Sequence, residues 1–316
     1  MSDADQPTYA YLGPAGTFTE AALLGWLAGR AADLLPCTTV DAALHSVRAG
    51  DADGAMVPLE NSVEGSVSAT LDALASGGPL VITAEALVPV SFVVMAAPGT
   101  RLHDVQAVTT HPHAEAQCRT WLTEHLPEAR LLPAASTAAA AASLVDPTRG
   151  AEAGLAAIAA PLAAEVYGLE VLAAGVGDNP SAETRFVLVR RPCAPEPATG
   201  SDKTSLVLFI GEDHPGALLE ILTEFAVRGV NLTRIESRPT GGGIGDYFFS
   251  IDIEGHVDDA RVGEAMTGLR RVCAEVRYLG SYPRTDGARP HLRRGVTDEE
   301  FREAQAWLAR VREGRG

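Results

Sequence analysis

The chain has 316 residues, about twice the length of a typical single domain, and this length favours two domains. Hydrophobic residues make up 46% and charged residues 21%, which is the composition of a folded globular protein and excludes a disordered chain. The formal net charge of −16 repels a phosphate backbone, so we exclude DNA and RNA as partners.

Targeting signals and cysteine frameworks are the next features to consider. The longest apolar stretches, such as residues 88–97, are shorter than the roughly 20 residues that cross a bilayer, so we expect no membrane span. The start Met-Ser-Asp-Ala-Asp lacks the basic and apolar regions of a secretory signal, which predicts a cytoplasmic protein. Four cysteines lie far apart without a Cys-x-x-Cys pair, which predicts reduced thiols, no disulfide and no metal site: Cys37, Cys118, Cys193 and Cys273.

Apolar runs alternate with helical patterns along the first 190 residues. This βαβα order predicts an α/β fold with mostly parallel sheets and helices on both faces. Binding sites in such sheets lie at the carboxyl ends of strands, where the following helices begin. We predict strands at residues 9–12, 55–59, 105–109, 130–134, 155–159 and 185–189, and helices at 17–28, at 66–75, from Pro112 and after Thr137.

A proline-rich stretch, residues 191–202, has no apolar periodicity and is predicted to be a linker. The order βαββαβ follows within residues 203–284, which is the order of a ferredoxin-like domain. Its two middle strands are predicted to connect through Gly241-Gly-Gly243. In the tail, residues 285–316, a capping box at Thr297-Asp-Glu-Glu300 predicts a final helix that packs on a neighbouring surface.

Two loops after predicted strands carry polar residues that suit a binding site. Gly13-Pro-Ala-Gly-Thr-Phe-Thr-Glu20 opens a helix at Thr17, and its free backbone N–H groups favour an anion, with a plain capped turn as the alternative. The second loop offers side chains for substrate contacts, with an ordinary helix cap as the alternative. Its candidate residues are Glu60, Asn61, Ser62, Gly65 and Ser66.

Three further positions follow the same logic. His111 ends a strand before Pro112, where it is placed to cap the helix, to bind a ligand or to transfer a proton. Ser136 and Thr137 open another helix. Arg185 enters the last strand of the first region and needs an acceptor, either a structural carboxylate or an anionic ligand.

These motifs together resemble the signature of the prephenate dehydratase family over nearly the whole chain. The order of the matching segments is Gly13-Pro-Ala-Gly-Thr-Phe-Thr-Glu20, Pro58-Leu-Glu-Asn-Ser-Val-Glu-Gly-Ser-Val67, His111-Pro-His-Ala114, Ser136-Thr137 and Thr184-Arg-Phe186. Gly216-Ala-Leu-Leu219 and Glu236-Ser-Arg-Pro239 resemble the regulatory ACT domain of that family. Two departures stand out: the family usually has Gln at the position of His113 and often Asn at that of Ala182.

The resemblance implies a catalytic region of two α/β lobes, similar to a periplasmic binding protein, with the active site between the lobes. It also implies a hydro-lyase reaction in which prephenate loses carbon dioxide and its ring hydroxyl to give phenylpyruvate, in phenylalanine biosynthesis. We expect no metal, nucleotide or redox cofactor. Of the catalytic residues that it implies, Thr184 is the donor to the departing hydroxyl, Arg185 binds a substrate carboxylate, Phe186 forms an apolar wall, and Glu60 or His111 is the proton source.

The remaining implied sites bind substrate and effector. The substrate-binding residues are Thr17, Asn61, Ser62, Gly65, Ser66, Ser136 and Thr137. A homodimer or homotetramer would bind L-phenylalanine between two ACT domains and be feedback-inhibited by it. The expected phenylalanine-binding residues are His214, Gly216, Ala217, Leu218, Leu219, Asn231, Glu236, Ser237, Arg238 and Pro239.

Three other interpretations stay open on the sequence. An arogenate dehydratase shares the fold and mechanism, and the motifs do not separate the two substrates. A non-aromatising prephenate decarboxylase would keep the hydroxyl, which makes an intact Thr184 unexpected. A non-catalytic amino-acid sensor would need no donor aimed at the ring hydroxyl.

Overall fold

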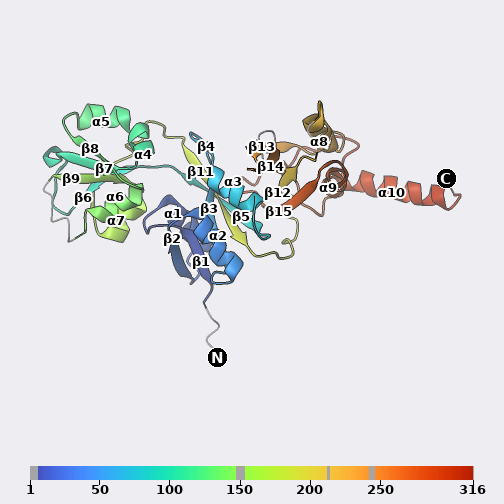
Figure 1. The fold of residues 1–316 in the computed structure, drawn as a ribbon, viewed down its shortest axis with the longest axis horizontal. Helices are drawn as coiled ribbons and strands as arrows, with labels where there is room; N and C mark the ends of the chain where they lie inside the picture. Colours follow the sequence, from blue (N-terminus) through green and yellow to red (C-terminus); the bar gives the residue numbers. More distant parts are fainter. Residues whose placement is uncertain (1–5, 147–153, 212–213, 242–245, 316) are drawn as a thin grey trace. The chain divides into compact units, whose positions relative to one another are not determined.

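A computed structural model describes residues 6–146, 154–211, 214–241 and 246–315 (Figure 1). Contacts divide the chain into two compact units. The first unit comprises Met1–Thr70 and Ala86–Val187, and the second comprises Leu71–Glu85 and Leu188–Gly316. The second unit therefore includes a segment that lies within the predicted catalytic region of the sequence.

The first lobe is built on a sheet with the strand order β2-β1-β3-β11-β5, and β4 pairs with β3. Strand β1 is parallel to both β2 and β3. Strands β5 and β11 run across the boundary between the two units, because each has residues in both. The strands are β1 (Thr8–Leu12), β2 (Asp33–Cys37), β3 (Gly54–Asn61), β4 (Gly65–Ser66), β5 (Val81–Pro89) and β11 (Glu183–Arg190).

Side-chain caps begin two of the helices on this sheet. Thr17 and Thr39 have extended backbones and accept hydrogen bonds from Glu20 N–H and Ala42 N–H, so each satisfies a donor that the first helical turn leaves open. Strands β2 and β5 and helix α2 were not predicted from the sequence. The helices are α1 (Phe18–Leu27), α2 (Val40–Ala49) and α3 (Ser68–Ala75).

The second lobe is built on a five-stranded sheet with the order β10-β6-β9-β7-β8. Strand β7 is parallel to β8 and β9, whereas β6 is antiparallel to β9 and β10, so this sheet is mixed and not mostly parallel as predicted. Buried alanines, among them Ala141, Ala157 and Ala163, let helices α6 and α7 pack closely on it. The elements are β6 (Val93–Ala96), η1 (Leu102–Asp104), β7 (Ala107–Thr110), α4 (Pro112–Gln117), α5 (Arg119–His125), β8 (Arg130–Pro133), α6 (Thr137–Ser143), β9 (Leu155–Ala159), α7 (Pro161–Tyr167) and β10 (Glu170–Ala174).

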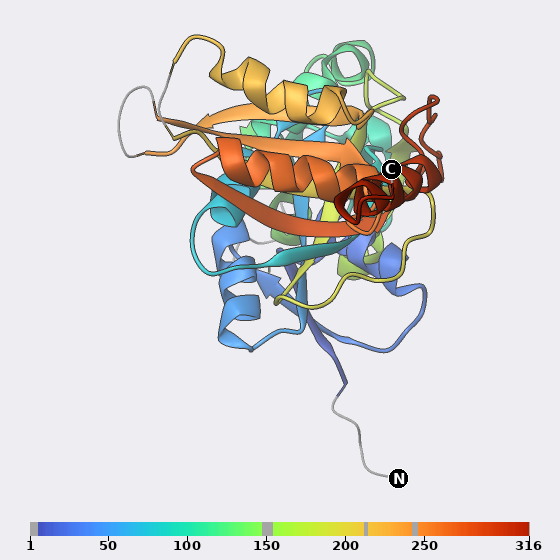
Figure 2. The same ribbon diagram turned by 90° about the vertical axis from the view of Figure 1, so that its right-hand side faces the viewer.

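The C-terminal part of the second unit has the predicted βαββαβ order, and its antiparallel sheet is ordered β13-β14-β12-β15. Figure 2 shows helices α8 and α9 side by side on one face of this sheet. Apolar residues of both helices and of the strands, including Phe225, Ile251 and Leu269, form its core. The predicted glycine connection between β13 and β14 extends into residues 242–245, outside the described residues. The elements are β12 (Asp202–Phe209), α8 (Ala217–Ala226), β13 (Leu232–Pro239), β14 (Tyr247–Glu254), α9 (Ala260–Val272) and β15 (Glu275–Pro283).

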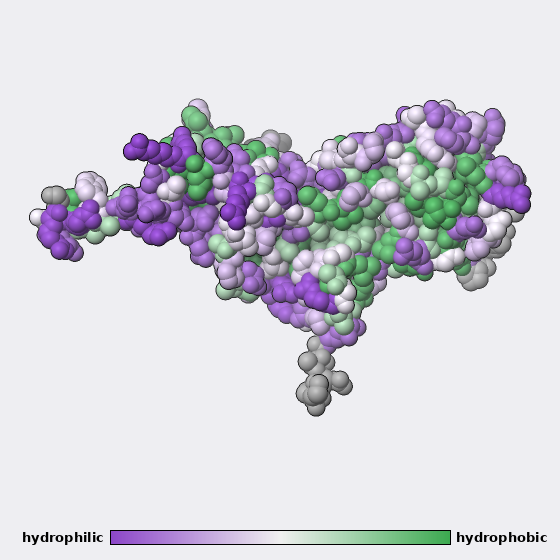
Figure 3. Space-filling model, turned by 180° about the vertical axis from the view of Figure 1, so that it is seen from behind, coloured by the Kyte–Doolittle hydropathy of each residue, from purple (hydrophilic) through white to green (hydrophobic). Residues whose placement is uncertain are grey.

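The final helix, α10 (Asp298–Arg312), begins with the predicted capping box of Thr297 and Glu300. Its first turn contacts α9, where Ala260 N–H donates to Asp298 Oδ1 at 2.8 Å. Beyond that turn the helix is exposed, including Leu308 and Val311, and Figure 3 shows it as largely hydrophilic at the left of the view. Among the described residues, no helix combines the length and apolar character needed to cross a membrane.

Candidate functional site

A cavity of about 340 Å³ lies in the first unit and is lined by residues of both lobes. The lining residues from the first lobe include residues of α1, β3 and β11. Those from the second lobe come from β6, α4 and α6 or from the loops that precede these three elements. Five of the predicted site residues meet here although they are up to 123 positions apart in sequence: Asn61, His111, Ser136, Thr137 and Thr184. The other lining residues are Leu12, Phe18, Glu64, Val90, Phe92, His113, Ala114, Gln117 and Ala135.

Asn61 fixes the hydroxyl of Thr184 in this cavity. The Asn61 Oδ1 atom accepts hydrogen bonds from the backbone N–H groups of Val63 (2.8 Å) and Glu64 (3.0 Å). The amide orientation is thereby defined, and Nδ2 donates to Thr184 Oγ1 at 2.8 Å. Because Thr184 accepts this bond, its own O–H proton is available to donate to a ligand.

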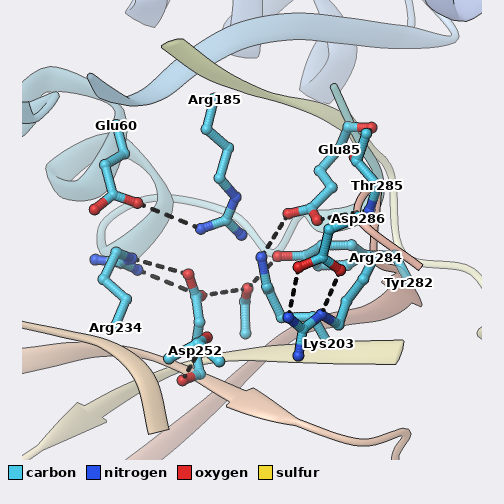
Figure 4. A network of polar contacts seen from close by, with 12 residues as sticks. Glu60, Glu85, Arg185, Lys203, Arg234, Asp252, Tyr282, Arg284, Thr285 and Asp286 are labelled. Carbon is cyan, nitrogen blue, oxygen red and sulfur yellow. Dashed lines mark hydrogen bonds and ion pairs between the residues drawn. The ribbon is translucent and has the colours of Figure 1, made fainter. Parts of the chain in front are cut away.

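Glu60 and Arg185 lie next to Asn61 and Thr184 in sequence but not in the cavity lining. Successive side chains of a strand point to opposite faces of a sheet, so Glu60 and Arg185 share the face away from the cavity. Figure 4 shows the two side chains directed toward each other, with Arg185 Nη1 at 3.8 Å from Glu60 Oε2. Arg185 is buried and Glu60 is half-exposed. The sequence left two acceptors open for Arg185, a structural carboxylate or an anionic ligand. The structure places a carboxylate of the protein beside it.

The apolar wall of the cavity comes from residues that were not selected from the sequence. Phe18 of α1 and Phe92 before β6 meet edge to face with ring centroids 5.5 Å apart. Leu12 and Val90 continue this wall. Phe186 is buried in the lobe core and is not a lining residue.

His111 caps α4 at the cavity wall. Its Nδ1 accepts a hydrogen bond from His113 N–H at 3.3 Å, which places the proton of the neutral ring on Nε2. Burial lowers the pKa of His111, and the nearby His113 ring lowers it further, while Glu64 acts in the opposite direction. The imidazole is therefore neutral near pH 7 and presents an N–H donor.

Glu64, His113 and Gln117 form a cross-lobe group that we call the Glu64 clasp. One carboxylate oxygen of Glu64 lies 2.7 Å from His113 Nδ1, and the other accepts from Gln117 Nε2 at 2.9 Å. Glu64 follows β3 in the first lobe, and its two partners lie on α4 in the second lobe. In the sequence, His113 stood out only as a departure from the family pattern, and Glu64 and Gln117 were missed. The one available signal was the spacing of four residues between His113 and Gln117 on a helix that starts at the site.

The other predicted substrate-binding residues serve local structure or line a neighbouring groove. Thr17 Oγ1 donates to Leu12 O and caps α1, and Ser62 Oγ accepts from Glu183 N–H at 2.9 Å. Gly65 and Ser66 line an open groove of about 690 Å³ that shares Asn61 and the Glu64 clasp with the cavity. Ser136 lines the cavity and caps α6 by accepting from Ala139 N–H at 3.0 Å.

A second cavity, of about 620 Å³, lies in the second unit at the start of α8. Gly216 has φ +100°, and apart from its chain neighbours no described residue has an atom within 4 Å of the position that a Cβ would take, so a side chain there would project into open space. Six of the ten residues predicted for effector binding line this cavity: His214, Gly216, Ala217, Leu218, Leu219 and Ser237.

The remaining four predicted effector residues do not line it. On β13 the alternation of the strand places Ser237 on the cavity side and its neighbours Glu236 and Arg238 on the opposite face. There Arg238 donates to Asp72 of α3 through two hydrogen bonds, from Nε at 3.0 Å and from Nη2 at 2.7 Å. Pro239, which ends β13, and Asn231, which precedes it, also lie outside the lining.

Family models match the two regions of the chain in order. The prephenate dehydratase model matches residues 9–194, more than half of the chain. The chain belongs to the prephenate dehydratase family. The ACT domain model matches residues 205–271, which confirms the predicted regulatory domain and, with the observed topology, the predicted fold class.

Individual relatives support the same assignment. A prephenate dehydratase from Mycolicibacterium vanbaalenii is 48% identical over 98% of this chain and 99% of its own length. The crystal structure of a prephenate dehydratase from Arthrobacter aurescens in complex with L-Phe is 53% identical, with a TM-score of 0.90, and the match covers 97% of this chain and 99% of that chain. A structure described as GqqA, a novel type of quorum-quenching acylase, is 32% identical with a TM-score of 0.79 over 88% of this chain and 98% of that chain.

Within this family framework, the first-unit cavity is the candidate active site and the second-unit cavity lies in the ACT domain. The titratable side chains lining the active-site cavity are Glu64, His111 and His113. Among the described residues, no cluster of three or more His, Cys, Asp or Glu side chains is arranged to hold a metal ion.

Proposed function

We propose that this chain converts prephenate to phenylpyruvate by concerted loss of carbon dioxide and of the ring hydroxyl, and that it acts in phenylalanine biosynthesis. The observation that carries this proposal is the hydrogen bond from Asn61 to Thr184 inside a cavity of the family's catalytic domain. A binding protein that does no chemistry would not need a hydroxyl donor held in this way.

Thr184 acts as an oriented hydrogen-bond donor to the departing hydroxyl. A threonine hydroxyl is a poor acid, so its contribution is stabilisation of the charge that develops on the leaving oxygen. Donors of this kind contribute about 3–4 kcal/mol to transition-state stabilisation because they are positioned before the reaction starts. Asn61 supplies that positioning, and its fixed amide leaves the Thr184 proton directed at the ligand.

Phe18 and Phe92 exclude water from the carboxylate that is lost as carbon dioxide. Hydration stabilises a localised carboxylate charge more than the dispersed charge of the transition state, so an apolar surround lowers the barrier. The edge-to-face pair closes this part of the cavity. We assign the wall to these two rings, and Phe186 supports it from the core of the first lobe.

For the proton source we favour His111 over Glu60. His111 lines the cavity and presents a neutral Nε2–H donor, whereas Glu60 lies on the other face of the sheet beside Arg185. For Arg185 itself we favour the structural ion pair. The substrate carboxylates then bind to local donors around the cavity, including the hydroxyl and backbone N–H of Thr137.

We further propose that phenylalanine inhibits the enzyme from the ACT-domain cavity, in a homodimer or homotetramer. The relative from Arthrobacter aurescens was solved in complex with L-Phe, and six predicted effector residues line this cavity here. Leu218, Leu219 and Tyr247 line it and are 39%, 68% and 44% exposed, which fits completion of the site by a second copy. A cytoplasmic location fits the four cysteines, which are all free.

Turnover of the purified protein with prephenate and with arogenate tests the proposal. Phenylpyruvate formed from prephenate, with a kcat/KM for arogenate at least tenfold lower, is the expected result. Preferential formation of phenylalanine from arogenate would favour the arogenate dehydratase. A decarboxylated product that keeps its hydroxyl would favour the decarboxylase, and binding without turnover would favour the sensor.

A further inference from the structure

We propose that Asp72 and Arg238 form the mechanical link between the ACT-domain cavity and the active site, so that this ion pair is required for inhibition but not for the chemistry. The inference deepens the proposed function and rests on it. Its starting point is the division of the chain, in which Leu71–Glu85, a segment within the catalytic part of the sequence, belongs to the same compact unit as the ACT domain.

The link begins at the effector cavity. Ser237 lines that cavity, and Arg238, the next residue of β13, points to the other face of the sheet. There it makes the two hydrogen bonds with Asp72, and these bonds raise the pKa of the Arg238 guanidinium. A planar, bidentate Arg–carboxylate pair fixes orientation as well as distance, so movement of β13 is passed to α3.

The link continues from α3 to the donor of the active site. Asp72 lies two residues after Thr70, which is fully buried and donates from Oγ1 to Pro58 O of β3 at 2.6 Å. Three residues further along β3, Asn61 donates to Thr184 Oγ1. The residues between Arg238 and Thr184 are therefore connected by short stretches of chain and by short hydrogen bonds. The last of these hydrogen bonds, from Asn61 to Thr184, orients the donor to the substrate.

A second contact holds the same segment from its other end. Glu85 of β5 is almost completely buried, and Lys203 of β12 donates to its Oε2 at 2.8 Å (Figure 4). Thr285 N–H donates to the other oxygen of Glu85 at 3.1 Å. This contact anchors the segment, so that a change at the more exposed Asp72–Arg238 pair moves α3 relative to a fixed end.

The decisive variant is Asp72→Asn, which keeps the shape and removes the charge. We expect its prephenate turnover without phenylalanine to stay within about threefold of the parent and its phenylalanine binding, measured by calorimetry, to persist. Phenylalanine should shift the prephenate KM of the parent about 5–150-fold, the usual range of allosteric coupling, and shift that of the variant less than twofold. The double variant Asp72→Arg with Arg238→Asp should regain at least part of the shift.

Glu224→Gln is the matched control, because Glu224 of α8 pairs at 2.6 Å with Arg228, four residues later in the ACT domain. It should keep the full phenylalanine effect. The proposal is overturned if Asp72→Asn is inhibited as strongly as the parent, or if it loses phenylalanine binding along with inhibition. Absence of phenylalanine binding or inhibition in the parent would instead reject the proposed regulation, and absence of prephenate turnover would reject the proposed activity.

A different observation, the Glu64 clasp, carries a second inference. We infer that His113 is a positioning residue that holds the carboxylate of Glu64 in the cavity wall when the dianionic substrate binds. Glu64 is a carboxylate in the cavity wall, where it repels two substrate carboxylates, and His113 Nδ1 lies 2.7 Å from it. The other titratable group at this point is His111, whose ring centroid lies 4.9 Å from that of His113.

The expected effect follows from the geometry of this contact. His113 holds one oxygen of Glu64, and without it the carboxylate is held by Gln117 and can turn toward the substrate. We expect His113→Ala to raise the prephenate KM about fivefold to tenfold with kcat nearly unchanged, the size of one partly screened charge interaction. His113→Gln, which keeps a donor, should stay near the parent, and the double variant of His113→Ala with Glu64→Gln should lose the rise.

His103→Ala serves as the control, because His103 is exposed and pairs with its neighbour Asp104 at 3.5 Å. It should keep the parental KM. An unchanged KM in His113→Ala would overturn the inference, as would an equal rise of KM when Glu64→Gln is also present. Failure of every variant and the parent to turn over prephenate would refute the proposed activity and not the clasp alone.

Discussion

The active-site cavity and the ACT-domain cavity are built in different ways. In the active site, polar side chains are held by other side chains of the same chain, as Asn61 holds Thr184 and Glu64 holds Gln117. In the ACT domain, the cavity is lined by a glycine turn at Gly216 and by exposed apolar side chains such as Leu219. A reaction needs donors at fixed positions, so its site is complete within one chain. A site formed between two subunits, as proposed for the ACT-domain cavity, is completed only when a second copy covers it.

The largest expected effect is at Thr184. Thr184→Val keeps the shape and removes the hydroxyl, and we expect kcat for prephenate to fall about 10²–10³-fold with little change in KM, because the bond matters mainly in the transition state. Steady-state kinetics measure both constants. Thr123→Val, at an exposed helix position where the hydroxyl bonds Arg119 O, should behave as the parent. A near-normal kcat in Thr184→Val would mean that a fixed donor is not what distinguishes the active site from the ACT-domain cavity.

Gly216→Val makes the corresponding test in the ACT domain. The new side chain projects into the open cavity, and φ +100° adds local strain at the start of α8. We expect phenylalanine to inhibit at least tenfold less effectively while prephenate turnover remains. Gly287→Val, also at a positive φ of +63° with open space around it, controls for backbone strain alone. If Gly216→Val stays as sensitive to phenylalanine as the parent, the effector binds elsewhere.

The fold was largely predictable because its signals are local. The βαββαβ order and the capping box at Thr297 follow from periodicity and from residues that act within one turn. The mixed sheet of the second lobe was not predictable, because the apolar strand β6 has the same pattern whether it pairs parallel or antiparallel.

The site was predictable in part for a related reason. A motif identifies which residues lie near the site, but the alternation of a strand decides which of them face it. Asn61 and Thr184 face the cavity, and their neighbours Glu60 and Arg185 face away. The same alternation separates Ser237 from Arg238. Glu64 and Gln117 were missed because the hydrogen bond between them joins two lobes, and no local sequence pattern predicts such a contact.

Within the catalytic lobe, Arg185 allows a binding role to be separated from a structural one. Arg185 is buried, so Arg185→Leu removes the polar and packing contacts of its guanidinium, and we expect it to lower the free energy of unfolding by about 1–3 kcal/mol. We expect a smaller change in the prephenate KM, less than about fivefold. Denaturant unfolding and kinetics on the same preparation measure the two effects, with the exposed Arg101→Leu as control. A tenfold higher KM at unchanged stability would restore the role as a substrate contact.

The smallest expected effect concerns the protonation of His111, which has no counterpart in the ACT-domain cavity. Its pKa is lowered in the folded protein, chiefly by burial, so the unfolded chain, with an ordinary pKa near 6.5, binds this proton more readily. The stability contributed by neutral His111 is therefore present above about pH 6.5 and is lost as the pH falls toward and through the folded pKa.

Protonation of His111 also breaks the bond that Nδ1 accepts from His113 N–H, and with it the orientation of the Nε2–H donor. We expect kcat for prephenate to fall severalfold on this acidic limb and the limb to be absent in His111→Gln, while the exposed His45→Gln keeps it. An unchanged acidic limb in His111→Gln would assign the proton to another group and leave His111 as the cap of α4 alone.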